Sequence, residues 1–321
     1  MKKILFYCCV CLILVILAAL VINPSKYIST CYNGLCIWAI NVVPSLLPFF
    51  FITTLLNELK IANKIAGNLH HISKFLYRSD GTGAYVQLMS IISGYPVGAK
   101  MISELYKQGA ISKKQSTKLS VFCSTSGPSF IIGSVGSIMF SSVKIGVVIF
   151  VCHILSAIIN GVIFRKYGDN QPIRPLLQKN GKSENVLYDC ALSSVLSCLT
   201  VGAFIAVFFV FSQILSDVKL IYPLEQLFTY LFKDQKKAAA FTAGLIECTN
   251  GCNMLAKTQG ILAVPLCCAL ISFGGVSVIF QSIAFLKSAR ANVKIFLFSK
   301  LLQMISSFVL CLVACLCFKI S

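Results

Sequence analysis

Charged side chains are scarce in this sequence, and acidic side chains are the scarcest. Asp, Glu, Lys and Arg together make up 12% of the 321 residues, and only 10 of them are acidic against 28 basic ones. A soluble globular domain carries about 25% charged residues, so the composition excludes an ordinary soluble protein. The hydrophobic share of 57% instead indicates several membrane-spanning helices, each of roughly 20 apolar residues.

Signals of catalysis, metal binding and nucleic-acid binding are also missing. The three histidines do not lie at metal-ligand spacing from a cysteine pair, and many of the sixteen cysteines fall in apolar runs, where cysteine behaves as a small hydrophobic side chain. The net charge of +18 comes from basic residues spread between apolar runs, whereas a nucleic-acid footprint gathers them on one face. No nucleophile lies near a general base. We therefore expect no catalytic residues, no metal, no cofactor and no nucleic-acid partner.

Apolar windows between charged loops predict an all-α integral membrane protein with about seven full transmembrane helices. Two further apolar segments, at about 83–103 and 238–256, are broken by glycine or proline and remain outside this count. The first apolar run is longer than the core of a cleavable signal peptide, so we expect it to be retained. The predicted full spans are 4–22, 34–56, 119–140, 143–164, 190–214, 261–286 and 296–317.

The distribution of Lys and Arg predicts how the two broken segments meet the membrane. If both are re-entrant hairpins and the N-terminus is cytoplasmic, nineteen basic residues, Lys300 among them, lie inside and eight lie outside. If both segments crossed fully, the 104–118 loop with its four lysines would move outside, against the positive-inside rule. We therefore predict a multi-pass protein of the cell membrane with a cytoplasmic N-terminus and two re-entrant helical hairpins.

The predicted order of spans and hairpins indicates an inverted repeat. Each half contains three full crossings, so the second half must have the opposite orientation to the first. We expect an N-terminal anchor at 1–33, a first repeat at 34–164 and a second, inverted repeat at 190–321. The 165–189 segment, which contains two prolines and mixed charge, is the predicted cytoplasmic linker.

The first broken segment contains a backbone that cannot form a regular helix. Gly94, Pro96 and Gly98 add backbone freedom or remove a hydrogen-bond donor, and Tyr95 lies between them. The freed peptide groups can bind a polar solute, with Lys100 one turn further on. The alternative is that Lys100 reaches the cytoplasmic interface and pairs there with Glu104.

The second broken segment contains Glu247, an acidic residue flanked on both sides by apolar sequence. A carboxylate within the membrane is costly and indicates a functional site. The polar or flexible residues that follow it suit a hydrogen-bonding solute or a cation, and they are Thr249, Asn250, Gly251 and Asn253. The alternative is a helix-packing site in which Glu247 is neutral or paired with Lys100.

Two more polar patches interrupt predicted spans at matching places in the two halves. The first contains Ser124, Thr125 and Ser126, and the second contains Gly274 and Gly275 with Gln281 two turns later. Small residues in membrane helices usually permit close packing, which is the alternative here. Their matched positions lead us to include both patches in the predicted substrate-binding site.

Three motifs resemble the YlbJ family of sporulation integral membrane proteins. They are SGYPVGAK at Ser93–Lys100 within the longer run Ser93–Phe140, GLIECTNGCNML at Gly244–Leu255, and SFGGVSVIFQ at Ser272–Gln281. The resemblance covers nearly the whole chain after the first span. It implies a nucleoside-recognition (Gate) domain, which concentrative nucleoside carriers and ferrous-iron permease cores share, and a membrane role in bacterial spore formation. It implies no particular substrate.

The leading hypothesis is a transporter-like carrier of a small polar solute, for which a nucleoside-like molecule is one candidate and a coupling cation a further partner. We expect contacts with membrane lipid, and a homo-oligomer remains open. The alternative is a non-transporting membrane scaffold for assembly of the spore envelope and cortex, which would bind partners through the basic loops 57–82 and 165–189. A membrane enzyme acting on lipid-linked precursors is the weakest alternative, because Lys100 and Glu247 would be its only acid–base pair.

Overall fold

The computed structural model describes residues 2–58, 67–79, 81–168 and 185–319, and within them the chain forms helices and no strand. This confirms the all-α prediction. The helices of the first half are α1 (Lys2–Ile22), α2 (Pro24–Ile37), η1 (Trp38–Val42), α3 (Val43–Glu58), α5 (His70–Tyr77), α6 (Gly81–Ser93), α7 (Val97–Lys107), α8 (Lys113–Phe122), η2 (Ser129–Met139) and α9 (Val143–Ile163). Those of the second half are α10 (Val186–Asp217), α11 (Tyr222–Phe232), α12 (Gln235–Ile246), α13 (Cys248–Leu255), α14 (Ala263–Phe273), α15 (Gly275–Ser288) and α16 (Val293–Phe318).

Four helical stretches in the described residues are long and apolar enough to cross a membrane. Three of them, α9, α10 and α16, match the predicted spans 143–164, 190–214 and 296–317. The fourth is Ala263–Ser288, which combines α14 and α15 and matches 261–286. A fifth candidate is the pair Val10–Ile22 and Pro24–Val42, which bends by 104°. The structure therefore offers four or five span candidates where the sequence predicted seven.

Three predicted spans differ from the helices that form, one of them 261–286, which is interrupted at Gly274 between α14 and α15. The span at 34–56 begins earlier, because Pro24 occupies a first-turn position where proline is tolerated, and the helix then continues through η1 into α3. The span at 119–140 is interrupted, because α8 ends at Phe122 and η2 begins only at Ser129. Pro128 follows Gly127 at this break, and proline disfavours helical geometry in the residue before it.

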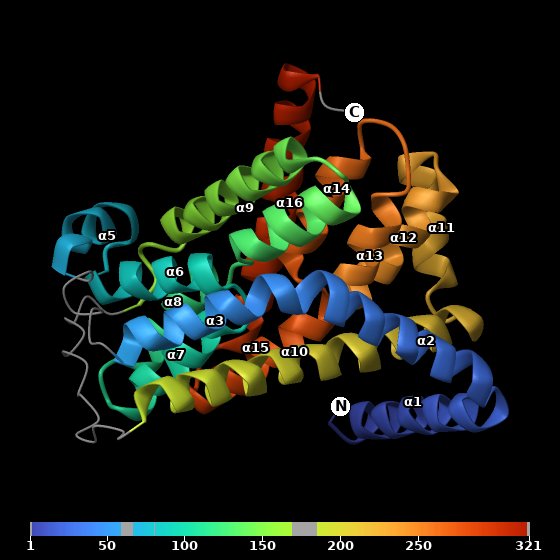
Figure 1. Cartoon of the computed structure of the whole chain (residues 1–321), viewed down its shortest axis with the longest axis horizontal. Helices are drawn as coiled ribbons and strands as arrows, with labels where there is room; N and C mark the ends of the chain where they lie inside the picture. The colour runs from blue at the N-terminus through green and yellow to red at the C-terminus, as the bar shows by residue number, and fades with distance from the viewer. Residues whose placement is uncertain (1, 59–66, 80, 169–184, 320–321) are drawn as a thin grey trace.

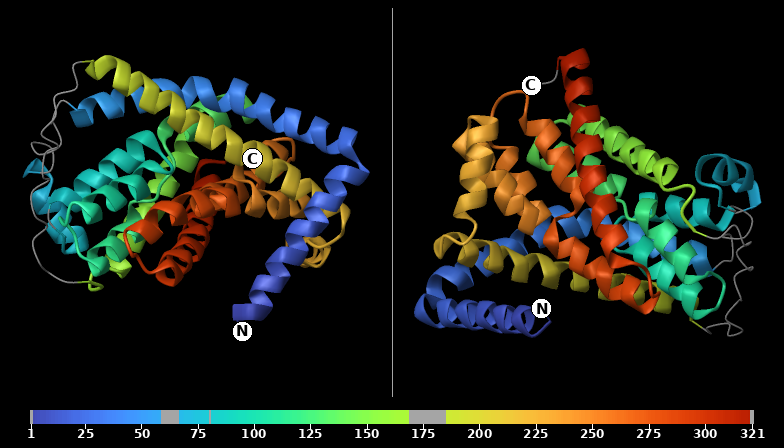
Figure 2. Two further views of the ribbon diagram at one scale, coloured as in Figure 1. Left: turned by 90° about the horizontal axis from the view of Figure 1, so that it is seen from below. Right: turned by 180° about the vertical axis from the view of Figure 1, so that it is seen from behind.

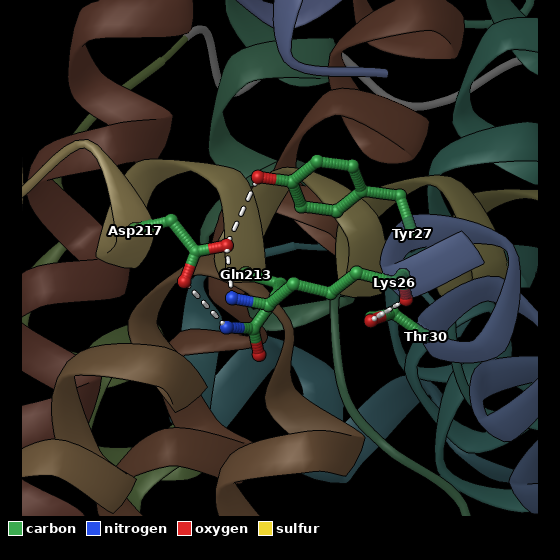
Figure 3. A network of polar contacts seen from close by, with 5 residues as sticks. All are labelled: Lys26, Tyr27, Thr30, Gln213 and Asp217. Atoms are coloured by element: carbon green, nitrogen blue, oxygen red, sulfur yellow. Dashed lines mark hydrogen bonds and ion pairs between the residues drawn. The ribbon is translucent and has the colours of Figure 1, made fainter. Parts of the chain in front are cut away.

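The α2–α3 helix and α10 run side by side along one side of the molecule (Figures 1 and 2). A polar cluster joins them near the end of α10 (Figure 3): Tyr27 Oη donates to Asp217 Oδ2 at 2.9 Å, and Lys26 Nζ lies 2.7 Å from the same oxygen. Gln213 Nε2 donates to Asp217 Oδ1 at 3.0 Å. Asp217 is thus held by three neighbours.

Helices from both predicted repeats share the two largest cores. In Figure 1, α5–α8 lie at one end of the molecule and α11–α13 at the other, with α9, α14 and α16 between them. In the described residues, α14 packs on α9, α15 packs on α7, and α16 packs on both α8 and α9. One core joins η2 and α9 to α12–α14 and α16, and the other joins α5–α8 to α15 and α16. The predicted domain boundaries remain a prediction. Of the 165–189 linker, residues 169–184 lie outside the described residues, and α10 already begins at Val186.

Candidate functional site

Four of the short helix breaks in the described residues lie close together, and their local sequences differ from regular helix. Gly94 adopts a φ of 79°, a conformation that glycine tolerates best, and Pro96 lacks a backbone N–H. Gly274 has a φ of 88° and ends α14. Glu247 is extended, with φ −131° and ψ 110°, and separates α12 from α13. The fourth break is the stretch from 123 to 127.

Glycines allow these breaks to pack against one another. A methyl group on Gly98 would lie 1.7 Å from the Cys123 carbonyl oxygen, and one on Gly94 would lie 2.8 Å from the Gly127 nitrogen. The first break therefore packs directly on the 123–127 break. In the second half, a methyl group on Gly275 would lie 3.0 Å from the Cys248 nitrogen, and one on Gly251 would lie 2.3 Å from the Gly244 Cα. Backbone meets backbone at all of these points.

Residues of the four breaks line a cavity of about 60 Å³, a volume well above the roughly 10–15 Å³ that one water molecule needs. Residues of each break line it, together with side chains of η1, α3, η2, α10 and α15. The lining residues are Val42, Leu46, Gly94, Tyr95, Ser126, Gly127, Phe130, Val201, Ile205, Glu247, Cys248, Thr249, Ile271, Gly274, Ser277, Val278 and Gln281. Apolar walls with a few polar groups are typical of a site for a small molecule.

Glu247 caps the helix that begins at the third break. Its Oε1 accepts from the Thr249 N–H at 3.1 Å and its Oε2 accepts from the Asn250 N–H at 2.7 Å, while the side chain is buried at 1% exposure. An acidic side chain at the N-cap accepts hydrogen bonds from backbone N–H groups that have no partner within the helix. Its negative charge also interacts favourably with the positive end of the helix dipole. Because each carboxylate oxygen can accept more than one hydrogen bond, Glu247 keeps acceptor capacity and is one of the residues that line the cavity.

Lys300 of α16, which is not among the lining residues, joins three of the breaks. Its Nζ donates to Tyr95 Oη at 2.9 Å, to the Ser124 carbonyl at 2.6 Å and to the Ser272 carbonyl at 3.2 Å. It also donates to Gln303 Oε1 at 3.1 Å. The side chain is 1% exposed, so these oxygens replace the water that an ammonium group would otherwise bind.

His153 of α9 makes a second connection between the halves. Its Nε2 accepts from the Ser126 N–H at 2.9 Å, which leaves Nδ1 to carry the proton and donate to Ser272 Oγ at 2.8 Å. Ser126 belongs to the first half and Ser272 to the second. His153 and Lys300 therefore both fix the segment around Ser272, from two different uninterrupted helices.

Seven of the predicted substrate-binding residues line the cavity, namely Gly94, Tyr95, Ser126, Glu247, Thr249, Gly274 and Gln281. Others support it from outside the lining. Ser124 supplies its carbonyl to Lys300, Thr125 Oγ1 lies 3.0 Å from Ser90 Oγ, and the Asn250 N–H binds Glu247. Gly98, Gly251 and Gly275 are close-packing positions. Pro96, Lys100 and Asn253 are not among the lining residues, and in the described residues no ion pair joins Lys100 to Glu247.

Sequence reasoning missed the two residues that connect the breaks. Lys300 was assigned to the cytoplasmic side, but the structure buries it, because α16 begins at Val293 and carries Lys300 two turns into the helix. The signal was available: Lys300 is an ionisable residue inside the apolar run 296–317. His153 is likewise a titratable residue inside a predicted span, yet no role was expected for it.

No family model matches the chain. It is similar to the sporulation integral membrane protein YlbJ of Bacillus subtilis (strain 168), at 28% identity over 314 residues that cover 89% of this chain and 77% of the relative. This confirms the resemblance that the three motifs carry.

The fold is similar to a solved structure of the concentrative nucleoside transporter CNTnw, a doubly substituted variant in an outward-facing state. The TM-score is 0.60 at 13% sequence identity, and the match covers 87% of this chain and 76% of that one. At this identity the likeness concerns the fold alone. The similarity to an integral membrane protein and the long apolar helices identify the chain as a multi-pass integral membrane protein, and the structural likeness shows a transporter-like fold.

Proposed function

We propose that this chain, a homologue of the sporulation integral membrane protein YlbJ, is a transporter-like carrier of a small polar solute that binds in the cavity between the four helix breaks. The observation that carries the proposal is the convergence of these breaks on one cavity with a few polar groups among apolar walls. Irregular backbone at membrane depth is tolerated where it is enclosed by protein or lines a watery cavity, and paired broken helices are typical of solute sites in transporters.

The order of elements supports an inverted repeat with two re-entrant hairpins. After α3 come α5, the broken pair α6/α7, the broken pair α8/η2 and the uninterrupted α9. After α10 come α11, the broken pair α12/α13, the broken pair α14/α15 and the uninterrupted α16. The same succession thus occurs twice, and the cavity lies where the breaks of the two series meet.

Helix lengths support the hairpin assignment. The helices α6, α7, α12 and α13 contain 13, 11, 12 and 8 residues, which is about 12–20 Å each at 1.5 Å per residue. None of these reaches the roughly 30 Å of a bilayer core. Because α6 packs against α7 and α12 packs against α13, each pair fits a hairpin that enters and leaves on one side.

The cavity chemistry favours a solute with hydrogen-bond donors and one apolar face. Glu247 offers acceptor capacity, while the hydroxyl of Ser277 is fully buried and has no hydrogen-bond partner among the described residues. Gln281 adds an amide that can donate and accept. Phe130, Val201 and Ile205 supply apolar walls. A nucleoside or nucleobase has both features, so we propose this class as the first to test.

Large exposed apolar side chains along α10 and α16 fit contact with lipid. They include Leu199 and Val207 on α10, and Leu301, Val309 and Val313 on α16. A second copy of the chain could cover part of the same surface. The expected lipid contact and homo-oligomer both remain predictions.

A solute screen on the purified full-length protein tests the proposal. Thermal unfolding in detergent would be followed with a panel of nucleosides, nucleobases, sugars and amino acids, for the wild type and for Glu247→Gln and Gln281→Ala. We expect one class to raise the melting temperature of the wild type in a saturable manner, and the shift to weaken in both variants. Lys100→Ala is the matched control, because Lys100 does not line the cavity and its replacement should leave the shift intact.

A failure of the whole panel to stabilise the wild type, or an unchanged shift in both cavity variants, would overturn the proposed site. A loss of the shift in Lys100→Ala would instead restore the sequence-based prediction that Lys100 binds solute. The relative's name further suggests a role in spore formation. We propose that Glu247→Gln reduces spore yield while the protein level is unchanged.

The scaffold alternative depends on the basic loops 57–82 and 165–189, whose residues 59–66, 80 and 169–184 lie outside the described part. Neutralising changes in these loops, compared with Glu247→Gln in a sporulation assay, separate the two functions. A larger defect from the loop changes would favour the scaffold.

A further inference from the structure

The ammonium group of Lys300 lies in a shell made entirely of oxygen acceptors. The four distances from Nζ run from 2.6 Å at the Ser124 carbonyl to 3.2 Å at the Ser272 carbonyl. The Tyr95 hydroxyl donates its own proton to the Ile271 carbonyl at 3.2 Å, so its oxygen presents lone pairs to Nζ. An ammonium group has three donors, fewer than the four oxygens around it. The shell therefore resembles the coordination of an ion more than a matched set of hydrogen bonds.

Helix breaks create the two carbonyl ligands. Ser272 lies in the last turn of α14, which ends at Phe273, and Ser124 follows the end of α8 at Phe122. Carbonyls at helix C-termini have no partner within the helix, and the dipole makes these ends negative. The C-terminal end of α14 and the unwound stretch after α8 thus direct two carbonyls at one point. Unwound carbonyls and half-helix C-termini are the groups that coordinate monovalent cations in membrane transporters.

The shell contains no negative side chain. In the described residues no carboxylate lies within ion-pair distance of Nζ, and Glu247 instead binds the N–H groups of Thr249 and Asn250. A buried ammonium group without a counter-ion is costly. A contact that only held the helices together would not need a charged group at this point. Neutral oxygens around a single positive charge are the arrangement expected for a monovalent cation site.

We infer that Lys300 is a tethered substitute for a monovalent cation, covalently held where a transporter of this kind would bind a coupling ion. The role of Lys300 in transport rests on the proposed carrier function, because the oxygen shell of Lys300 fixes three of the breaks that line the solute cavity. Because this group is covalently attached to the chain, the assembly of the breaks becomes independent of Na⁺ and K⁺. Removal of the side chain converts the shell into a site for a free cation.

Thermal unfolding of the purified full-length protein tests this without any solute. Choline chloride would be replaced stepwise by NaCl, KCl or NH₄Cl at constant ionic strength. The wild type should unfold at the same temperature in all four salts. Lys300→Ala should unfold at a lower temperature in choline, and at least one small cation should raise it again in a saturable manner, since a ligand stabilises the folded state as its concentration exceeds Kd. Lys300→Met, which fills the space without charge, should show no such recovery.

Lys294→Ala is the matched control, because Lys294 is an exposed cation on the same helix and its loss should create no cation dependence. The inference is overturned by a saturable effect of Na⁺ or K⁺ on the wild type, or by an absence of cation-specific recovery in Lys300→Ala. If Lys300→Ala yields no folded protein in choline, it should be purified in NH₄Cl. Folded protein that unfolds on exchange into choline supports the inference, whereas no folded protein in either salt overturns it.

The cation measurement and the solute screen can fail separately. Loss of the Glu247-dependent solute shift would reject the proposed carrier site while the cation dependence of Lys300→Ala remained. If a solute stabilises the wild type but Lys300→Ala shows no cation dependence, the inference that Lys300 replaces a cation is rejected and the carrier proposal stands.

Discussion

Lys300 Nζ donates a hydrogen bond to Tyr95 Oη at 2.9 Å, although 205 residues separate them in the chain. The ammonium group also lies 4.8 Å from the centre of the Tyr95 ring, within cation–π range. A residue of the last helix therefore fixes the first helix break, and the shape of the cavity depends on a contact between distant parts of the chain.

Replacement of Tyr95 by phenylalanine should destabilise the protein without changing its packing. The substitution removes one acceptor from Lys300 and leaves the Ile271 carbonyl without its donor, and a buried group left unsatisfied costs about 1–3 kcal/mol. We expect a lower melting temperature in detergent. Tyr188→Phe, at an exposed tyrosine of α10, should leave it unchanged, and equal effects of the two changes would contradict a special role for Tyr95.

His153→Leu should destabilise the protein, because it removes the imidazole that links Ser126 in the first half of the chain to Ser272 in the second. The Ser126 N–H and the Ser272 hydroxyl would both lose the imidazole, at about 1–3 kcal/mol for each orphaned group. Leucine keeps much of the side-chain volume, so the effect reports hydrogen bonding more than a void. Thermal unfolding provides the measurement, with exposed His70→Leu as the control. A melting temperature within error of the wild type would show that the network is dispensable.

Gly98→Ala should be among the most damaging single-methyl additions in the described chain. The added Cβ would lie 1.7 Å from the Cys123 carbonyl oxygen, so either the first break or the 123–127 break must move. Overpacking of this kind costs about 1–3 kcal/mol or more. Folded yield and melting temperature should both fall. Gly67→Ala, where no atom lies within 4 Å of the new methyl group, should be tolerated, and similar behaviour of the two variants would argue against close packing at Gly98.

The Lys26–Asp217 ion pair should contribute little to stability despite its 2.7 Å distance. Lys26 is half exposed, and exposed ion pairs contribute about 1 kcal/mol or less. A double-mutant cycle with Lys26→Gln and Asp217→Asn should therefore give a coupling energy below about 1 kcal/mol. Raised salt should reduce it further. A coupling of several kcal/mol would mean that the polar cluster of Figure 3 is the main connection between α2 and α10.

Local chemistry made several features predictable from the sequence. Gly94 and Pro96 disrupt a helix wherever they occur together, and Glu247 stands out because a carboxylate is rare between apolar residues. The uninterrupted helices α9, α10 and α16 were also predictable, because long apolar runs leave few alternatives. The breaks between Phe122 and Ser129 and at Gly274 were missed, since small residues are also compatible with a continuous span.

The sequence by itself determined the membrane class, the helical fold and the places where the helices at 94–96 and 247 break, because each depends on residues that are neighbours in the chain. Only the tertiary structure decided which lysine joins the helix breaks. Lys100 follows a break closely in sequence, yet Lys300, from the far end of the chain, takes the oxygen shell that three breaks create. The physical reason is that orphan carbonyls bind whichever donor folding brings to them, and this partner is set by how α16 packs on α8, α9 and α14.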